Sequence, residues 1–229
     1  YTLYSDTLEY STVTKIADIL GTSVIVSDSN IIYSRRGWYD TQNNTSMLLD
    51  RSIVVSKSQQ LTGDTIYYDR DRGFGEVFGN MFMNDTLRKV IMEGQYGFYN
   101  EKTEYSFATD SARVLEYSGI DTLYLHADTL KGFTLPDSTR MLQAYYGTRF
   151  FRNDMQGVCD SMNYFTRDSA IYMYKDPIVW SDNYQIFGDT IKVFMNDSTV
   201  DWAHIPHFAF AAQQKDSLFF DQLAGKDLK

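Results

Sequence analysis

The sequence has few of the residues that cross-link, interrupt or anchor a chain. Its 229 residues include one cysteine, so no disulfide can form within the chain, and only three prolines. No run of about 18 apolar residues is present that could cross a bilayer as a helix. Lys and Arg number 21 against 30 Asp and Glu, and the net charge of -9 disfavours nucleic acid and anionic membrane surfaces as partners. Stability must therefore come from a large hydrophobic core.

Both ends of the sequence lack features that a complete exported chain would have. The chain starts at Tyr1 rather than Met, and no basic segment leads into an apolar run as in a signal peptide. We therefore expect that a targeting segment has been removed. Asp216-Ser217-Leu218 begins a motif that recurs throughout the chain, and the sequence stops shortly afterwards at Lys229. We expect the chain to be truncated inside a longer repeat array.

The composition favours strands over helices. Aromatic residues make up 16% of the chain, with 18 Tyr and 15 Phe. Tyr, Phe, Val, Ile and Thr suit a pleated, half-buried surface, and Ala-, Leu- and Glu-rich helical stretches are missing. No Pro-rich, Gly/Ser-rich or low-complexity linker divides the sequence. We predict an all-β fold with a single domain over residues 1–229.

A short motif recurs along the chain. Of 24 Asp residues, 14 are followed directly by Ser or Thr, where chance alone gives about four. Apolar residues follow two and four positions after the Asp, which places them on one face of a strand. The full form is found in Asp6-Thr7-Leu8-Glu9-Tyr10, Asp64-Thr65-Ile66-Tyr67-Tyr68, Asp160-Ser161-Met162-Asn163-Tyr164 and Asp189-Thr190-Ile191-Lys192-Val193, and in part in Asp121-Thr122-Leu123-Tyr124-Leu125 and Asp128-Thr129-Leu130.

We interpret the Asp-Ser/Thr pair first as a cap or turn bond at the beginning of each strand. The alternative is that the hydroxyl is modified, because Asp-Ser/Thr-apolar resembles the O-glycosylation acceptor pattern of some Gram-negative bacteria. Several copies continue through a polar turn into a second strand, as Asp69–Gly73 leads into Gly75–Met83. This succession predicts antiparallel hairpins of about 20–30 residues each.

Several segments in order resemble a known family. Leu61–Asp69, followed by a turn and Gly75–Met81, is similar to the OstA repeat, in which a Gly/Ala-Asp strand is followed by a strand ending near Gly-Asn-apolar. Gly37–Thr41, Gly94–Tyr99 and Ile186–Thr190 resemble further segments of OstA/LptA-like lipopolysaccharide-transport proteins. The resemblance covers most of the chain.

The resemblance implies a fold and a function. Proteins of this family form a folded-over antiparallel sheet, a β-jellyroll or "β-taco", with an apolar groove along its length and an open end. They are periplasmic or outer-membrane-associated, hold the acyl chains of lipopolysaccharide, and stack end to end with other Lpt-type β-jellyroll proteins in a bridge between membranes. For this chain we therefore expect lipopolysaccharide or lipid A as ligand, end-to-end or self-association, no cofactor, no metal and no catalysis.

If this is so, the apolar residues after the repeat Asp should line the groove. Val77 and Met81 should contribute from the paired strand. The expected lining is Leu8, Tyr10, Ile66, Tyr68, Val77, Met81, Leu123, Leu125, Met162, Tyr164, Ile191 and Val193. The assignment depends on strand register, because a slip of one residue would turn the whole set outward.

Few residues suggest chemistry. His204 and His207 with Asp201 nearby form the one close histidine pair, but Pro206 favours a polar turn over a metal site. We expect His126 to be a hydrogen-bonded structural histidine within a strand. Cys159 lacks a basic neighbour that would favour the thiolate, and we expect it to be inert.

Two other functional classes stay open. A carbohydrate-binding β-sandwich or β-solenoid module would present exposed aromatics, such as Trp38 or Tyr145, above a closed core. We expect most of these aromatics to be core residues and cross-strand pairs instead. An all-β hydrolase would need two carboxylates converging in a cleft, and carboxylates are too plentiful here to indicate one.

Overall fold

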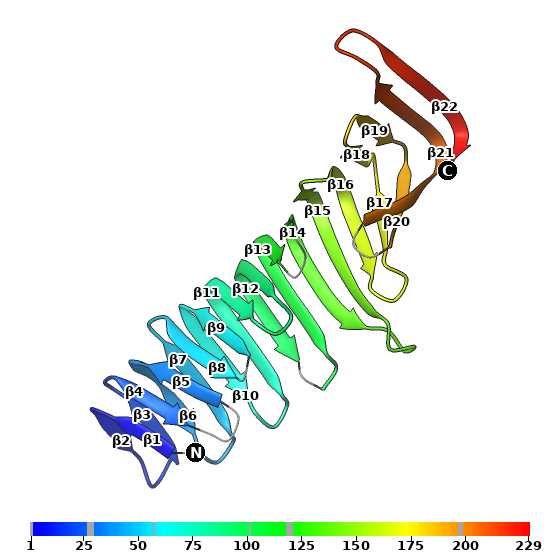
Figure 1. Ribbon diagram of the computed structural model, residues 1–229. Coiled ribbons are helices and arrows are strands. Elements are labelled where there is room, and N and C mark those ends of the chain that lie inside the picture. The colour runs from blue at the N-terminus through cyan, green and yellow to red at the C-terminus, as the bar shows by residue number, and fades with distance from the viewer. Residues whose placement is uncertain (1, 27–29, 57, 101, 118–120, 197–198) are drawn as a thin grey trace. The chain divides into compact units, whose positions relative to one another are not determined.

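The structure is a computed structural model that describes residues 2–26, 30–56, 58–100, 102–117, 121–196 and 199–229. This part of the chain consists of strands and turns, and it holds no helix that could cross a membrane (Figure 1). Two compact units, residues 1–112 and 113–229, are each described by themselves. The expectation of one continuous domain over 1–229 stays a prediction.

Unit 1 is built from short strands that alternate between two halves of a sheet. Its strands are β1 (Thr2–Ser5), β2 (Leu8–Tyr10), β3 (Ile16–Ile19), β4 (Ser23–Val26), β5 (Asn30–Ser34), β6 (Arg36–Asp40), β7 (Thr45–Leu49), β8 (Ser52–Ser56), β9 (Gln59–Gly63), β10 (Thr65–Asp69), β11 (Phe74–Asp85), β12 (Val90–Asn100) and the first part of β13 (Tyr105–Glu116). Strands β1, β4, β5, β8 and β9 pair antiparallel in that order and form half A. Strands β2, β3, β6, β7 and β10 pair in the same way and form half B. Strands β11 and β12 run through both halves.

Unit 2 repeats this plan with longer strands. It contains the rest of β13, then β14 (Leu123–Thr134), β15 (Arg140–Arg152), β16 (Met155–Phe165), β17 (Ala170–Tyr174), β18 (Ile178–Ser181), β19 (Tyr184–Phe187), β20 (Thr190–Asn196), β21 (Thr199–Gln214) and β22 (Phe220–Leu228). Half C consists of β18, β19 and one segment of each of the long strands, such as residues 156–158 of β16 and 210–213 of β21. Half D consists of β17, β20 and the remaining segment of the long strands, such as residues 161–165 of β16 and 199–204 of β21. The predicted all-β, folded-over antiparallel sheet of repeated hairpins is confirmed.

The chain passes between the two halves of a unit at corners of two kinds. At five corners that lead from half A to half B or from half C to half D, the chain carries an Asp followed by Ser or Thr. The five such corners are at Asp6, Asp64, Asp128, Asp160 and Asp189. At each of these corners the residue directly before the Asp is small, as Gly63 and Ala127 are, because the inside of the bend has no room for more.

At six corners in the other direction, two successive residues both have positive φ. Gly79 and Asn80, with φ of 74° and 49°, are one example, and Tyr146 and Gly147 are another. The other pairs are Asp50-Arg51, Asp110-Ser111, Lys175-Asp176 and His207-Phe208. Because left-handed conformations are unfavourable for most of these residues, the surrounding ladders must hold them.

The two kinds of corner are bonded to each other. The Asp64 N–H donates to the Gly79 carbonyl at 2.9 Å, and one Asp64 carboxylate oxygen accepts from Asn80 Nδ2 at 2.7 Å. The Arg51 guanidinium lies 3.3 Å from the other oxygen. In unit 2, Lys175 Nζ lies 3.0 Å from the Asp160 carboxylate in the same way. The corner Asp thus ties together three successive bends.

Asp-Ser/Thr pairs also occur at turns between adjacent strands, where their role differs. Asp85 Oδ1 accepts from the N–H groups of Leu87 and Arg88 and so closes the turn after β11. Thr86 donates its N–H and its hydroxyl to the Ser58 carbonyl in the turn beside it, each at 2.9 Å. The predicted turn bond is therefore confirmed at such turns, although the pair there follows a strand, and the predicted position at the beginning of a strand is confirmed at the corners. The pairs Asp28-Ser29 and Asp197-Ser198 lie outside the described residues.

Candidate functional site

In unit 1 the predicted lining residues lie on one side of the sheet. Leu8, Ile66 and Val77 belong to a row of half B that also contains Ile19 and Leu48, directly opposite one another on successive strands. Most of the row is inaccessible, since Leu48 is 1% exposed and Ile66 and Val77 are 3% exposed. Only the other half of the folded sheet can cover these side chains, so this face points inward. Leu8, on the edge strand β2, is 40% exposed.

The next inward row of half B lies farther from the corners. Tyr10 and Tyr68 stand in it, opposite Ala17 and Ser46. Tyr68 is half-buried and Tyr10 is 49% exposed. Met81 lies on the half A side of its corner and is buried. All six residues predicted in unit 1 therefore share the inner face, while their part in ligand binding stays a prediction.

The inner face of half A carries an aliphatic row that the motif does not reveal. Its members oppose one another from β1 to β12, and all but one are half-buried rather than buried. They are Leu3, Ile25, Ile32, Val54, Leu61, Met83 and Met92. A continuous, partly accessible aliphatic strip thus faces the buried row of half B.

The six residues predicted in unit 2 also lie on inner faces. Met162 and Ile191 belong to a fully apolar row of half D with Leu130, Ala144 and Met173. Tyr164 and Val193 stand in the next row of half D, on either side of Ile171. Leu123 and Leu125 lie on the inner face of half C, where Leu125 pairs with Phe150.

Sequence reasoning missed the inner residues that come before the Asp. The corner shifts the alternation, so positions three and one before the Asp face inward together with positions two and four after it. Around Asp64 these are Leu61 and Gly63, then Ile66 and Tyr68. The same pattern, apolar or small at all four positions, surrounds the other corner Asp residues. That pattern was available in the sequence as a signal.

No backbone ladder among the described strands joins the free margins of the two halves within a unit. Each half ends there in its own turns, such as the turn after β11 in half A and the turns after β6 and β10 in half B. The halves are connected covalently at the corners and elsewhere meet through side chains. Moving the margins apart would break packing but no strand-to-strand hydrogen bond.

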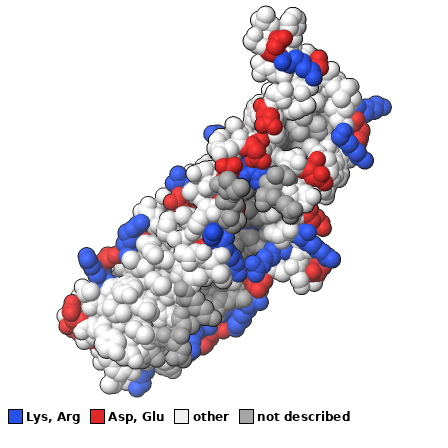
Figure 2. Space-filling view, viewed as in Figure 1, with Lys and Arg blue, Asp and Glu red and all other residues white. Residues whose placement is uncertain are grey.

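Aromatic rings gather on the opposite, outer faces. In unit 1 Phe98 contacts Phe74, Tyr105 and Phe107, with ring centroids 5.4–5.6 Å apart. In unit 2 Phe194 stacks on Trp202 at 4.0 Å and 10°. These rings pack against their cross-strand neighbours, so most of the aromatics are cross-strand pairs but not inner core. Figure 2 shows acidic and basic side chains interspersed on the visible face of the molecule.

The arrangement offers little for catalysis. Burial raises the pKa of the Cys159 thiol to about 12, which keeps it protonated. Among the described residues no group of three or more His, Cys, Asp or Glu side chains is placed to hold a metal ion. His204 Nε2 lies 2.9 Å from Asp227 Oδ2, and this hydrogen bond lowers the pKa of Asp227. His207 has a φ of 67° at a corner of β21.

One buried cation approaches the inner face of half C at its margin. Arg152 directly opposes Met155 and is 12% exposed in its side chain. Its guanidinium binds both carboxylate oxygens of Asp154, at 2.5 and 2.8 Å. These bonds lower the pKa of Asp154, and the pair is therefore charged but internally neutralised.

Comparisons with known proteins find matches among solved structures. No family model matches the sequence, and no curated protein matches it. One of the solved structures that match is that of LptH, the LptA homologous periplasmic component of the conserved lipopolysaccharide transport device from Pseudomonas aeruginosa. The match has a TM-score of 0.27 and 10% identity and covers 72% of this chain and 93% of that one.

Proposed function

We propose that this chain is a non-catalytic scaffold for lipopolysaccharide transport that holds acyl chains between the inner faces of its folded sheet. The observation that carries the proposal is the pairing of two apolar inner faces whose margins are not joined by any described ladder. Half A presents its aliphatic strip, from Leu3 to Met92, toward the buried row of half B. A lipid tail could enter there by displacing side-chain contacts alone.

The chemistry of the inner faces supports an alkyl ligand. Each methylene that moves from water into such a surface contributes about 0.8 kcal/mol, so a single acyl chain would supply several kcal/mol. Met81, Met155, Met162 and Met173 are buried on the inner faces. Unbranched methionine side chains adapt their shape easily, which suits chains that slide rather than lock.

We further propose a periplasmic or outer-membrane-associated location and end-to-end contact with other Lpt-type β-jellyroll proteins or with copies of this chain. Support comes from the architecture, because hairpins that add along one axis leave strand edges at which another chain can pair. The ligand in this proposal is lipopolysaccharide, bound through its lipid A part.

Photo-crosslinking from paired positions tests the proposal. A probe at Ile66 or Met162 faces inward, while a probe at the next residue, Tyr67 or Asn163, faces outward on the same strand. With purified lipopolysaccharide we expect crosslinks from the inner position of each pair and none from the outer one.

Two results would count against it. Equal crosslinking from both members of a pair would place the lipid elsewhere. The absence of lipid crosslinks, together with crosslinks from Trp38 or Tyr145 to a soluble glycan, would favour the alternative of a carbohydrate-binding module.

A further inference from the structure

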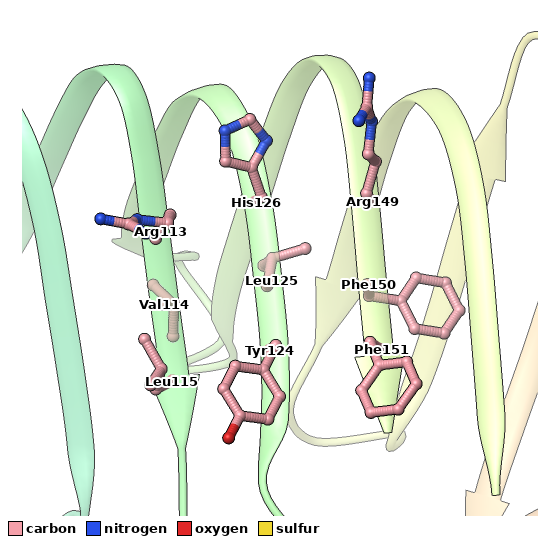
Figure 3. A pocket seen from close by; sticks show the side chains of 9 residues that line it. All are labelled: Arg113, Val114, Leu115, Tyr124, Leu125, His126, Arg149, Phe150 and Phe151. Atoms are coloured by element: carbon pink, nitrogen blue, oxygen red, sulfur yellow. The ribbon is translucent and has the colours of Figure 1, made fainter. Parts of the chain in front are cut away.

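A pocket of about 200 Å³ lies on unit 2. It is lined by three consecutive residues from each of β13, β14 and β15. They are Arg113, Val114, Leu115, Tyr124, Leu125, His126, Arg149, Phe150 and Phe151. Figure 3 shows them on three neighbouring strands at three levels, with Val114, Leu125 and Phe150 in the middle.

The alternation of strands places the mouth of this pocket on the outer face. Leu125 and Phe150 oppose each other, are 3% and 5% exposed, and belong to the inner face of half C. Their neighbours on either side in the sequence must point the other way. The pocket therefore opens on the outer face and shares with the inner face only Val114, Leu125 and Phe150.

One side of the pocket is cationic. Arg113, His126 and Arg149 lie at one level on the three strands (Figure 3), and both arginines are exposed. Figure 3 shows the guanidinium of Arg113 turned away from β14, so a ligand placed over β14 would meet Arg149 and His126. Arg149 makes no ion pair with any residue that the structure describes. His126 Nδ1 is buried without a hydrogen-bond partner, contrary to the expectation of a hydrogen-bonded structural histidine.

The other side of the pocket is aromatic. Tyr124 and Phe151 face each other across β14 and β15 with ring centroids 6.3 Å apart, and they are 48% and 43% exposed. Leu115 completes this level (Figure 3). Two carboxylates near the ends of these strands already have other partners, since Asp121 accepts from Asn153 and Asp154 is bound by Arg152.

We propose that this pocket binds a phosphorylated sugar. Guanidinium groups bind phosphate oxygens through short, charge-assisted hydrogen bonds, and arginine does so better than lysine because its donors form a planar fork. The polarised C–H groups of a pyranose ring pack against the electron-rich faces of aromatic rings. Donors and rings lie two residues apart along the same strands, roughly 7 Å, which matches an anionic group attached to a sugar ring.

Titration of the full chain with glucose 6-phosphate at low salt tests the proposal. We expect saturable binding, with shifts in the NMR signals of His126 and of the amides of β14 and β15. Glucose and inorganic phosphate should each bind about tenfold more weakly or worse, because each supplies one of the two contacts. Absence of saturable binding, or equal affinity for inorganic phosphate, would overturn the proposal.

Two variants and a control assign the binding to the pocket. R149Q should weaken glucose 6-phosphate binding about tenfold, and F151A should reduce the affinity to that of inorganic phosphate. The matched control is R167Q, which removes another exposed arginine of unit 2, paired with Asp137 at a turn. Its affinity should equal that of the unchanged chain. Binding by R149Q that equals the unchanged chain would overturn the assignment.

The same variant distinguishes two sources of the phosphorylated sugar. In a second arm, lipid A in detergent micelles replaces glucose 6-phosphate. If R149Q weakens both ligands by the same factor, the pocket takes a lipid head group. If only glucose 6-phosphate is weakened, the ligand is a free sugar phosphate. Neither result depends on whether acyl chains bind at the inner faces.

Discussion

Strand β16 carries Cys159 and Met162 on its inner face and Phe165 on its outer face, and the same division runs through both units. The inner rows nearest the corners hold aliphatic, methionine or small residues. The outer faces hold rings in contact with rings on neighbouring strands. The difference indicates two tasks: cross-strand aromatic pairs stabilise each half from outside, while the inner rows supply mainly apolar side chains that pack between the halves.

The largest expected effect comes from truncating the inner face. Leu48 is 1% exposed, and Leu48→Ala should lower the free energy of unfolding by about 2–5 kcal/mol, because a cavity is left in a row that cannot collapse freely. The control is Met47→Ala, which changes the adjacent outward side chain and should cost about 1 kcal/mol or less. Urea unfolding followed by circular dichroism measures both. Equal losses would contradict the division into faces.

The next effect concerns the turns at the margins. The carboxylate of Asp85 is nearly inaccessible, and its Oδ2 accepts from Gln59 and Arg88 at 2.8 and 3.0 Å. Asp85→Asn keeps the turn bonds to Oδ1 but points an amide donor at two other donors. We expect a loss of about 1–3 kcal/mol in the free energy of unfolding. The control Asp168→Asn, at an exposed turn, should change it by about 0.5 kcal/mol or less, and a similar loss there would argue against a special role for Asp85.

A smaller effect is expected on the outer face. Phe194→Ala removes the ring stacked on Trp202 and should destabilise unit 2 by about 0.5–1.5 kcal/mol beyond the loss from buried area. A double-mutant cycle with Trp202→Ala isolates this coupling from other changes. Leu218→Ala, at a side chain 79% exposed, serves as the control. A coupling energy of zero between Phe194 and Trp202 would mean that this outer pair of rings does not stabilise half D.

The smallest effect is a dependence on pH. Burial by itself would raise the pKa of Asp85, but its hydrogen bonds from Gln59 and Arg88 outweigh burial and lower the pKa below 3.8. A carboxyl whose pKa is lower in the folded state stabilises the fold above its ordinary pKa and loses that contribution as the pH falls through the folded value. Unfolding free energy should therefore decrease below about pH 4, and less steeply in Asp85→Asn. An unchanged slope in the variant would assign the acid sensitivity to other groups.

Local spacing allowed much of the inner face to be predicted. The Asp-Ser/Thr motif places apolar residues two and four positions later, and Ile66, Met162 and Ile191 are all inward. The corners with two positive φ values could not be predicted in the same way. Their residues range from Gly79-Asn80 to His207-Phe208 and share no side-chain type, because the paired neighbouring strands impose the bend.

The pocket on the outer face was beyond sequence reasoning for a different reason. Arg113, His126 and Arg149 come from three strands, and only the pairing register brings them to one level. Tyr124 was read as part of a motif copy, and its exposure follows from its position between the inward Leu123 and Leu125. The spacing of residues within one strand indicates which side chains face inward. A site formed by several strands can be predicted only when the pairing register of those strands is known.

The division between the faces leads to one decisive measurement. The chain carries inner methionines, such as Met162 and Met173, and the outward Met47, so methyl-labelled methionine reports on both faces in a single sample. In a complex with lipid A, we expect intermolecular nuclear Overhauser effects from acyl-chain protons to the Met162 and Met173 methyl groups and none to Met47. Effects at Met47 with none at Met162 and Met173 would contradict acyl-chain binding between the halves of the sheet.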